Sequence, residues 1–244
     1  MPGKVDRFTA AWSRILPQAC ALCGLPAGQR RVCRGCRDDL PWLEPACPRC
    51  ARPLPFRAAL CDCSELTLAG IDRLFAALAY EFPVDGLLAG AKFGRQPALA
   101  AAAGELLAAR LARRRDGRLP ALLLPVPLHR RRLRRRGFNQ ALEIARPCAR
   151  RLGIPLRPGV CRRTRDTPPQ SGLGGPARRR NLTGAFAADR RLRGLRVAIV
   201  DDVVTTGSTV SAVATALRAA GAAAVEVFCV ARVLRRPGGR AQPR

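Results

Sequence analysis

The residues with the clearest chemical potential lie at 197–209, read as Val-Ala-Ile-Val-Asp-Asp-Val-Val-Thr-Thr-Gly-Ser-Thr. The apolar run predicts a buried strand, and Ser208 is a typical residue for the start of a helix. A helix N-terminus offers free backbone N–H groups and a positive dipole end to phosphate, and Gly207 lets the backbone come close. Asp201 and Asp202 can accept hydrogen bonds from ribose hydroxyls or bind hydrated Mg²⁺. The segment therefore predicts a site for a ribose phosphate.

In this interpretation the two carboxylates are the catalytic candidates, and the turn after them supplies backbone and hydroxyl donors. These phosphate-binding candidates are Val203, Thr205, Thr206, Gly207, Ser208 and Thr209. The alternative is that one hydroxyl caps the helix and the carboxylates are merely solvated. Because capping needs a single Ser or Thr, a whole cluster favours a ligand site.

Eight of the eleven cysteines lie between residues 20 and 63, in four closely spaced pairs. Three pairs are C-x2-C and the last is C-x-C, and two such pairs can present four thiolates to one Zn²⁺. We assign Cys20, Cys23, Cys33 and Cys36 to one site, and Cys47, Cys50, Cys61 and Cys63 to the other. The spacing is also compatible with an interleaved pairing, the first pair with the third.

Four-cysteine sites have no open coordination position, so we expect structural zinc and disfavour a zinc-dependent hydrolase. Zinc would supply folding energy to a region that is too short and too poor in large apolar groups to fold alone. The other three cysteines, Cys148, Cys161 and Cys229, lie in apolar surroundings and are predicted to be small core residues.

The chain is strongly basic, with 44 basic and 17 acidic residues and a formal net charge of +27. Two zinc–thiolate sites would leave the charge at about +23. Such a chain attracts polyanions such as nucleic acid and polyphosphate. Lys4 and Lys92 are the only lysines, so a compositional bias towards Arg is the alternative explanation.

No apolar run is long enough to cross a membrane, and the N-terminus lacks a secretory apolar segment. We therefore expect a cytoplasmic protein without membrane insertion, whose paired cysteines are reduced and available to a metal.

The expected elements alternate between strand and helix, which predicts an α/β fold with an open parallel sheet. Strands are predicted at 71–80, 119–126, 157–163, 196–200 and 224–233. Helices are predicted at 84–92, 98–114, 139–152 and 208–220, with Pro147 kinking or splitting the third. We expect three parts: residues 1–66, an N-terminal helix at 5–16 and a zinc module; residues 67–234, the sheet domain; and residues 235–244, a disordered basic tail.

Residues 197–209 match the phosphoribosyl pyrophosphate (PRPP) signature of type I phosphoribosyltransferases. Three further motifs narrow the resemblance: Pro-Val-Pro-Leu-His at 125–129, Arg-Gly-Phe-Asn-Gln at 136–140, and residues 165–181, which contain Arg-Asp-Thr-Pro-Pro-Gln-Ser-Gly and Arg-Arg-Arg-Asn. With the cysteine module, they resemble the ComF (ComFC/GntX-like) family, which carries a double zinc ribbon. The resemblance covers about residues 18–234.

The resemblance implies that PRPP binds with Mg²⁺ and that Val126, Pro127 and Leu128 form the pyrophosphate loop. Residues 164–181 would close over the ligand, with Arg178, Arg179 and Arg180 facing pyrophosphate. A solvated basic loop is the alternative for these arginines. Lys92 either contacts phosphate or is a cation at a helix C-terminus.

Residues 130–136 contain six Arg interrupted only by Leu133. They could neutralise pyrophosphate or bind the phosphates of single-stranded DNA without sequence preference. The resemblance implies a part in DNA uptake during natural transformation, with other DNA-uptake proteins as partners.

Two hypotheses follow. In the first, the chain is a PRPP-binding transferase in which an acceptor displaces pyrophosphate from C1 of ribose. No general base or base-binding hood is recognisable, so neither the acceptor nor turnover is predicted. In the second, the chain is a non-enzymatic zinc-ribbon protein that handles single-stranded DNA and keeps the PRPP site as a relic or a sensor.

Overall fold

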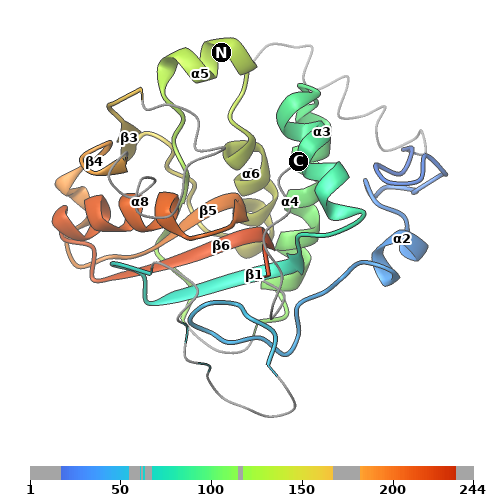
Figure 1. Cartoon of the computed structure of the whole chain (residues 1–244), viewed down its shortest axis with the longest axis horizontal. Coiled ribbons are helices and arrows are strands. Elements are labelled where there is room, and N and C mark those ends of the chain that lie inside the picture. The colour runs from blue at the N-terminus through green and yellow to red at the C-terminus, as the bar shows by residue number, and fades with distance from the viewer. Residues whose placement is uncertain are drawn as a thin grey trace. The chain divides into compact units, whose positions relative to one another are not determined.

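The computed structural model describes residues 18–54, 61, 63, 68–114, 118–166 and 182–234 (Figure 1). The chain divides into two compact units, residues 1–41 and 42–244. The helix expected at 5–16, the tail at 235–244 and most of the loop expected at 164–181, with Arg178, Arg179 and Arg180, lie outside the described residues.

The second unit is built on a four-stranded parallel sheet, as expected for the α/β class (Figure 1). Its strands, in spatial order, are β1 (Arg73–Ala79), β6 (Ala224–Arg232), β5 (Arg196–Val204) and β2 (Leu122–Pro125). They are nearly continuous apolar runs and are almost wholly buried, as strands covered on both faces must be. The sheet therefore forms the centre of this unit's core.

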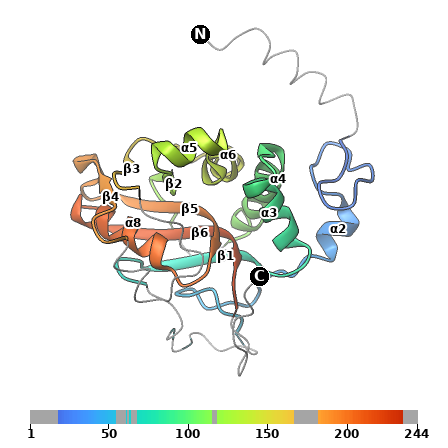
Figure 2. The ribbon, with the colours of Figure 1, turned by 45° about the horizontal axis from the view of Figure 1, so that its top comes forward.

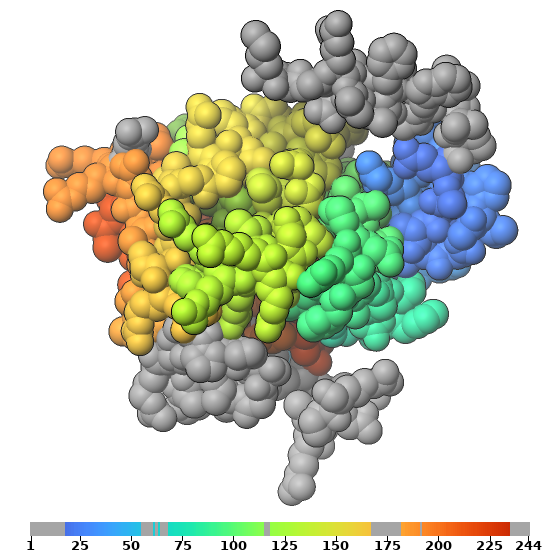
Figure 3. All heavy atoms as spheres, turned by 90° about the horizontal axis from the view of Figure 1, so that it is seen from above, coloured from blue at the N-terminus to red at the C-terminus, as the bar shows by residue number. Residues whose placement is uncertain are grey.

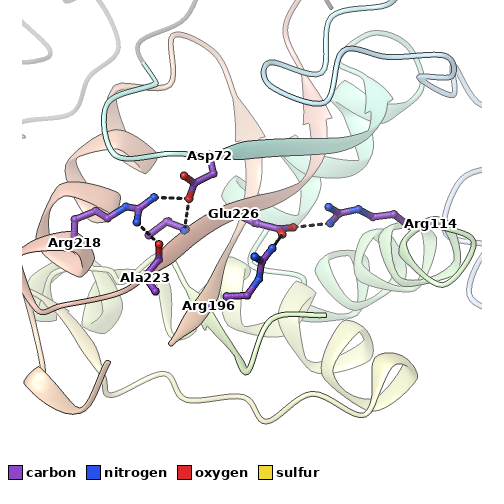
Figure 4. Close-up of polar contacts among 7 residues, drawn as sticks. Asp72, Arg114, Arg196, Arg218, Ala223 and Glu226 are labelled. Carbon is purple, nitrogen blue, oxygen red and sulfur yellow. Dashed lines mark hydrogen bonds and ion pairs between the residues drawn. The ribbon is translucent and has the colours of Figure 1, made fainter. Parts of the chain in front are cut away.

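Helices cover both faces of this sheet (Figures 1 and 2). The helix α8 (Ser208–Ala219) packs into the core cluster that contains Val225 and Val227. The intervening residue, Glu226, accepts hydrogen bonds from Arg114 at 2.7 Å and Arg196 at 3.3 Å (Figure 4). Arg114 lies just beyond the end of α4 (Pro97–Leu111). Because neighbouring strand residues point to opposite faces, α8 and α4 lie on opposite sides of the sheet.

The helices α4 and α6 (Gln140–Leu152) pack closely because Gly104 has no side chain. A Cβ placed on Gly104 would lie 2.5 Å from the carbonyl oxygen of Ile144 and 2.9 Å from Pro147 Cγ. Pro147 does not split α6, which is one continuous helix; the proline is buried against α4. Of the two predicted outcomes, the split is therefore wrong, because α6 continues through Pro147 despite the missing N–H.

The segment that begins at Trp42 lies along the outer edge of β1. Trp42 pairs with Leu78 in an antiparallel bridge, and the Leu43 N–H donates to the carbonyl of Ala77 at 3.0 Å. Further along, the Leu74 N–H donates to the carbonyl of Pro48 at 3.1 Å. Ala51 is buried in the core cluster of the sheet. The second group of cysteines thus belongs to the same compact unit as the sheet, whereas the cysteine pattern alone suggested a boundary near residue 66.

Several elements differ from those expected, among them the following three. The strand β5 continues to Val204 and so contains both carboxylates, and residues 130–136 form a helix, α5 (Arg130–Arg136). A separate antiparallel pair joins β3 (Cys161–Arg163) to β4 (Phe186–Ala188), where only the first strand was expected. Cys148, Cys161 and Cys229 are buried core residues, as expected. Within the described part of the chain, no helix has the length and apolar character needed to cross a bilayer.

Candidate phosphate site and cysteine clusters

Asp201 and Asp202 are both buried at the carboxyl end of β5. The Asp201 carboxylate accepts a hydrogen bond from the Asp202 N–H, and the Asp202 carboxylate accepts one from the Val203 N–H, both at 2.9 Å. Burial and the neighbouring charge of Asp202 raise the pKa of Asp201 well above its ordinary value, and Lys92 partly opposes them. Burying two adjacent carboxylates is unfavourable for folding, because desolvation and their mutual repulsion both disfavour the charged form. Their oxygens can bind a hydrated hard cation or vicinal hydroxyls.

Cationic and hydroxyl groups lie near Asp202. Lys92 Nζ, in the last turn of α3 (Val84–Phe93), lies 3.9 Å from Asp202 Oδ2. Burial lowers the pKa of Arg136, an effect that the charge of Asp202 opposes. Burial and the charges of Asp85 and Asp202 raise the pKa of the Tyr80 phenol. The sequence gives no signal for Tyr80 at this site, and it places Arg136 in the basic run at 130–136 and in the motif at 136–140 without assigning it to the carboxylates.

The turn after β5 leaves the start of α8 open to an anion. Gly207 is the N-cap residue, with φ of 78°, in the left-handed region that favours glycine. Because glycine has no side chain, the N-cap position itself places nothing over the free N–H groups of the first turn. The hydroxyls of Thr206 and Ser208 are hydrogen-bonded to each other at 2.9 Å. The expected phosphate cradle at Val203, Thr205, Thr206, Gly207, Ser208 and Thr209 is thus a strand end, a turn and a helix start.

The residues expected to form the pyrophosphate loop follow β2 and lie beside β5. The Val126 N–H donates to the carbonyl of Val200 at 2.9 Å, which extends the strand pairing by one residue. Asn139, the N-cap of α6, donates from Nδ2 to the Val126 carbonyl at 3.0 Å and accepts from the Ala141 N–H. Pro127 is buried and Leu128 half-buried. A side chain that caps one helix therefore also fixes the path of this loop.

The helix α5 lies on the face drawn in Figure 3, and most of its arginines are exposed to solvent. His129 caps its start by accepting from the Arg131 N–H, and Gly137, with φ of 86°, ends it. Arg95, just beyond α3, donates to the carbonyl of Arg135 at 2.7 Å, so the ends of α3 and α5 lie side by side. Four arginines of α5 are exposed: Arg130, Arg131, Arg134 and Arg135.

Two phenylalanines near these helices are unusually exposed. Phe82, just before α3, has 85% of its surface exposed, and Phe93, the last residue of α3, has 77%. Lys92 Nζ lies 6.0 Å from the centroid of the Phe93 ring. An aromatic ring beside basic groups is a platform on which a nucleic acid base can stack.

The first unit holds Cys20, Cys23, Cys33 and Cys36, whose sulfurs all lie within 4.8 Å of one another. A zinc tetrahedron with Zn–S bonds of about 2.3 Å spaces its sulfurs about 3.8 Å apart. The Cys23 and Cys33 sulfurs lie 3.8 Å apart, so the cluster fits zinc. Burial raises the pKa of Cys20, but the combined hydrogen bonds from backbone N–H groups to its sulfur have the larger effect and lower the pKa to about 6. The lowered pKa favours the thiolate, which is the form that binds metal.

The second unit holds Cys47, Cys50, Cys61 and Cys63 in an equivalent cluster, again within 4.8 Å. The Cys47 and Cys63 sulfurs lie 3.7 Å apart, and those of Cys61 and Cys63 lie 3.5 Å apart. The sequential grouping of the pairs is therefore the one that the structure forms, in place of the interleaved alternative. Cys47 and Cys50 are buried, with 1% and 3% of their surface exposed. The two cysteine clusters support structural zinc.

Comparisons with known proteins agree with this architecture. Residues 11–64 match the family model "Double zinc ribbon domain", and residues 139–244 match "Phosphoribosyl transferase domain". The chain is 36% identical over 224 residues to the "DNA utilization protein YhgH" of Escherichia coli strain K12, covering 90% of this chain and 99% of that one. It is 33% identical over 207 residues to the "Competence protein F" of Haemophilus influenzae, covering 82% of this chain and 90% of that one.

The chain belongs to the ComF family. Among solved structures, a glutamine PRPP amidotransferase from Bacillus subtilis matches 53% of the chain with 24% identity and a TM-score of 0.37, covering 26% of that protein. This partial overlap adds nothing to the assignment, which follows from the relatives that match along nearly their whole length. The ComF assignment agrees with both parts of the architecture, the cysteine clusters and the parallel sheet with its carboxylate-bearing strand.

Proposed function

We propose that this ComF protein binds PRPP with Mg²⁺ at the carboxyl end of β5 and is a phosphoribosyltransferase-type protein. The observation that carries the proposal is the pair of buried carboxylates directly before a glycine-capped helix N-terminus. This arrangement lies at the carboxyl edge of a parallel sheet, where open α/β folds bind their ligands. The nearby cations Lys92 and Arg136 complement a highly anionic ligand.

Each part of PRPP has a matching group in this proposal. The 5-phosphate would accept hydrogen bonds from the N–H and hydroxyl groups of residues 205–209. Asp201 and Asp202 would bind the ribose hydroxyls and hydrated Mg²⁺. The backbone at Val126, Pro127 and Leu128 would meet the pyrophosphate, together with Lys92 and with Arg178, Arg179 and Arg180.

With these contacts the protein's own residues could promote transfer by electrostatics alone. The bond between C1 and the pyrophosphate oxygen breaks, pyrophosphate leaves with the electron pair, and a nucleophilic acceptor bonds to C1. Charge grows on the leaving group, where fixed cations and N–H groups stabilise it. Mg²⁺, when bound, would neutralise part of that charge.

A ligand series tests this proposal. With Mg²⁺ present, we expect PRPP to bind more tightly than either ribose 5-phosphate or pyrophosphate, because only PRPP contacts both the turn at 205–209 and the loop at 126–128. Equal, weak binding of all three anions would instead indicate attraction to a basic surface. The natural control is the Asp202→Asn variant, which we expect to lose the preference for PRPP.

A second function is favoured by the exposed arginines of α5 and by the exposed Phe93 at the end of α3, which the Arg95–Arg135 hydrogen bond brings beside α5. We propose that this surface handles single-stranded DNA, in line with the names of the relatives, which refer to DNA utilization and competence. In this alternative the protein acts in the cytoplasm during DNA uptake, and PRPP is a sensory or relic ligand.

Salt dependence separates the two functions. For single strands, the logarithm of affinity falls with the logarithm of salt concentration with a slope of about −0.7 per neutralised phosphate. Replacing Arg130, Arg131, Arg134 and Arg135 by Ala should flatten this slope and leave PRPP affinity nearly unchanged. Asp202→Asn should lower PRPP affinity and leave the salt dependence of DNA binding nearly unchanged. A DNA affinity that does not respond to salt would contradict binding through α5.

A further inference from the structure

Arg232 is a buried arginine at the end of β6, with 2% of its surface exposed. Its Nε donates to the carbonyl of Cys50 at 3.3 Å, and its Nη1 donates to the carbonyl of Thr205 at 3.0 Å. Cys50 belongs to the second cysteine cluster, and Thr205 begins the turn before α8. One guanidinium therefore spans two sites that are 155 residues apart in the chain.

The backbone of Arg232 adds to this link. Arg232 is paired in register with Val204 on one side and with Ala79 on the other, and its carbonyl accepts from the Tyr80 N–H at 2.9 Å. Its Nη1 also donates to the carbonyl of Val204 at 3.5 Å and to the carbonyl of Val233. The residue thus lies between two strand ends. One is followed by Tyr80, and the other by residues 205–209, the proposed phosphate turn.

The contact with Thr205 has a consequence for anion binding. In a planar trans peptide, the carbonyl and the following N–H point in opposite directions. With the Thr205 carbonyl directed at the buried guanidinium, the N–H of Thr206 points away from it. Holding this carbonyl therefore orients a donor of the phosphate turn before any ligand arrives.

We propose that Arg232 is a positioning residue that couples metal binding at the second cysteine cluster to the shape of the phosphate turn. Metal fixes the backbone at Cys50, the Cys50 carbonyl holds the guanidinium, and the guanidinium holds the Thr205 carbonyl. Coupling between two sites is reciprocal, so an anion bound at the turn also strengthens metal binding at the cluster. Only the ligand part of this proposal depends on the proposed PRPP site.

Two variants test the role of Arg232. Arg232→Lys keeps the charge but loses the planar fork that can bridge two carbonyls. The control is Arg218→Met. Arg218 also donates to backbone carbonyls, those of Gly70, Ala222 and Ala223. It pairs with Asp72 as well, as Figure 4 shows. Unlike Arg232, Arg218 contacts neither the cysteine cluster nor the phosphate turn in these interactions.

The first measurement is amide hydrogen exchange of the full zinc-loaded chain without ligand. We expect Arg232→Lys to speed exchange at 203–209 and at 47–54 and to leave α6 protected, whereas Arg218→Met leaves both segments unchanged. Unchanged exchange at 203–209 would overturn the coupling. Faster exchange throughout the unit, including α6, would also overturn it, because Arg232 would then serve general stability.

The second measurement follows zinc transfer to a chelator, with and without PRPP and Mg²⁺. Changing a residue that supports metal ligands typically weakens metal binding about 10- to 100-fold, so Arg232→Lys should release one zinc at least tenfold faster. PRPP should slow that release in the wild type and not in the variant. If the wild type binds PRPP without slowing release, the coupling is wrong. If it does not bind PRPP, the proposed function fails, and hydrogen exchange still decides the coupling.

Discussion

Lys92 Nζ lies 3.9 Å from Asp202 Oδ2, which places a cation from the end of α3 against the carboxylates at the end of β5. The two residues are separated by most of the sheet domain in sequence. Lys92 is more than one-third exposed, so the pair contributes little to folding. Its position beside the phosphate turn is better explained by a ligand that carries negative charge.

Replacing Lys92 by Met should therefore affect binding more than stability. We expect PRPP affinity to fall about tenfold, the effect of losing a contact worth about 1.4 kcal/mol. The free energy of unfolding should stay close to that of the wild type. Arg146→Ala is the control, because Arg146 makes an exposed ion pair with Glu143 within α6. Calorimetric titration of both variants checks this expectation, and equal losses in the two would contradict it.

Asp201→Asn should make the ligand-free protein more stable and unable to bind PRPP. The pKa of Asp201 is raised in the folded chain, so its contribution to stability is full below the unfolded pKa of about 3.9 and is lost as pH rises towards the folded pKa. Asparagine avoids this loss. Urea unfolding should show the variant gaining stability relative to the wild type as pH rises above the unfolded pKa. A variant whose relative stability falls as pH rises would contradict the buried-carboxylate account.

Gly207→Ala should damage the site because Gly207 has φ of 78°. A residue with a Cβ in the left-handed region costs about 1–2 kcal/mol. Gly153→Ala is the matched control, since Gly153 ends α6 with φ of 66° and open space around it. Both variants should lose similar stability in thermal unfolding, and only Gly207→Ala should lose PRPP binding. Equal binding by the two would show that the turn is not the phosphate site.

The two cysteine clusters should respond differently to mutation. Cys23 is exposed in the first unit, whereas Cys47 is buried beside core residues of the sheet. Cys23→Ser and Cys47→Ser should each remove one of two zinc ions, measured by metal analysis. Because metal binding is folding energy at such sites, Cys47→Ser should also lower the unfolding temperature of the sheet unit. Retention of both ions in either variant would contradict the cluster assignment.

The parts of this chain with a strong local pattern were predictable from the sequence. Paired cysteines identified both clusters, and an apolar run followed by Asp201 and Asp202 identified β5 and the turn before α8. Strand β5 is longer than expected, because two carboxylates normally argue against a buried strand; we propose that here they bind a ligand. The helix α5 was missed because its six arginines give no apolar stripe.

Features that depend on tertiary contact were not predictable. Pro147 was expected to kink or split its helix, and the sequence could not show that Gly104 lets α4 pack closely enough to hold that helix together. Tyr80 and Arg232 belong to no motif, and their positions near the candidate site become visible only when the ends of β1, β5 and β6 come together. The division at residue 41 likewise depends on the contacts of residues 42–48 with β1.

Calorimetric titration of the zinc-loaded protein with PRPP and Mg²⁺, beside the Asp201→Asn/Asp202→Asn variant, tests the proposed PRPP site most directly. We expect saturable binding with one PRPP per chain, and loss of that binding in a variant that remains folded. Binding that is unchanged in the variant would place PRPP elsewhere on the basic surface. An absence of binding by folded wild-type protein would contradict the PRPP site itself.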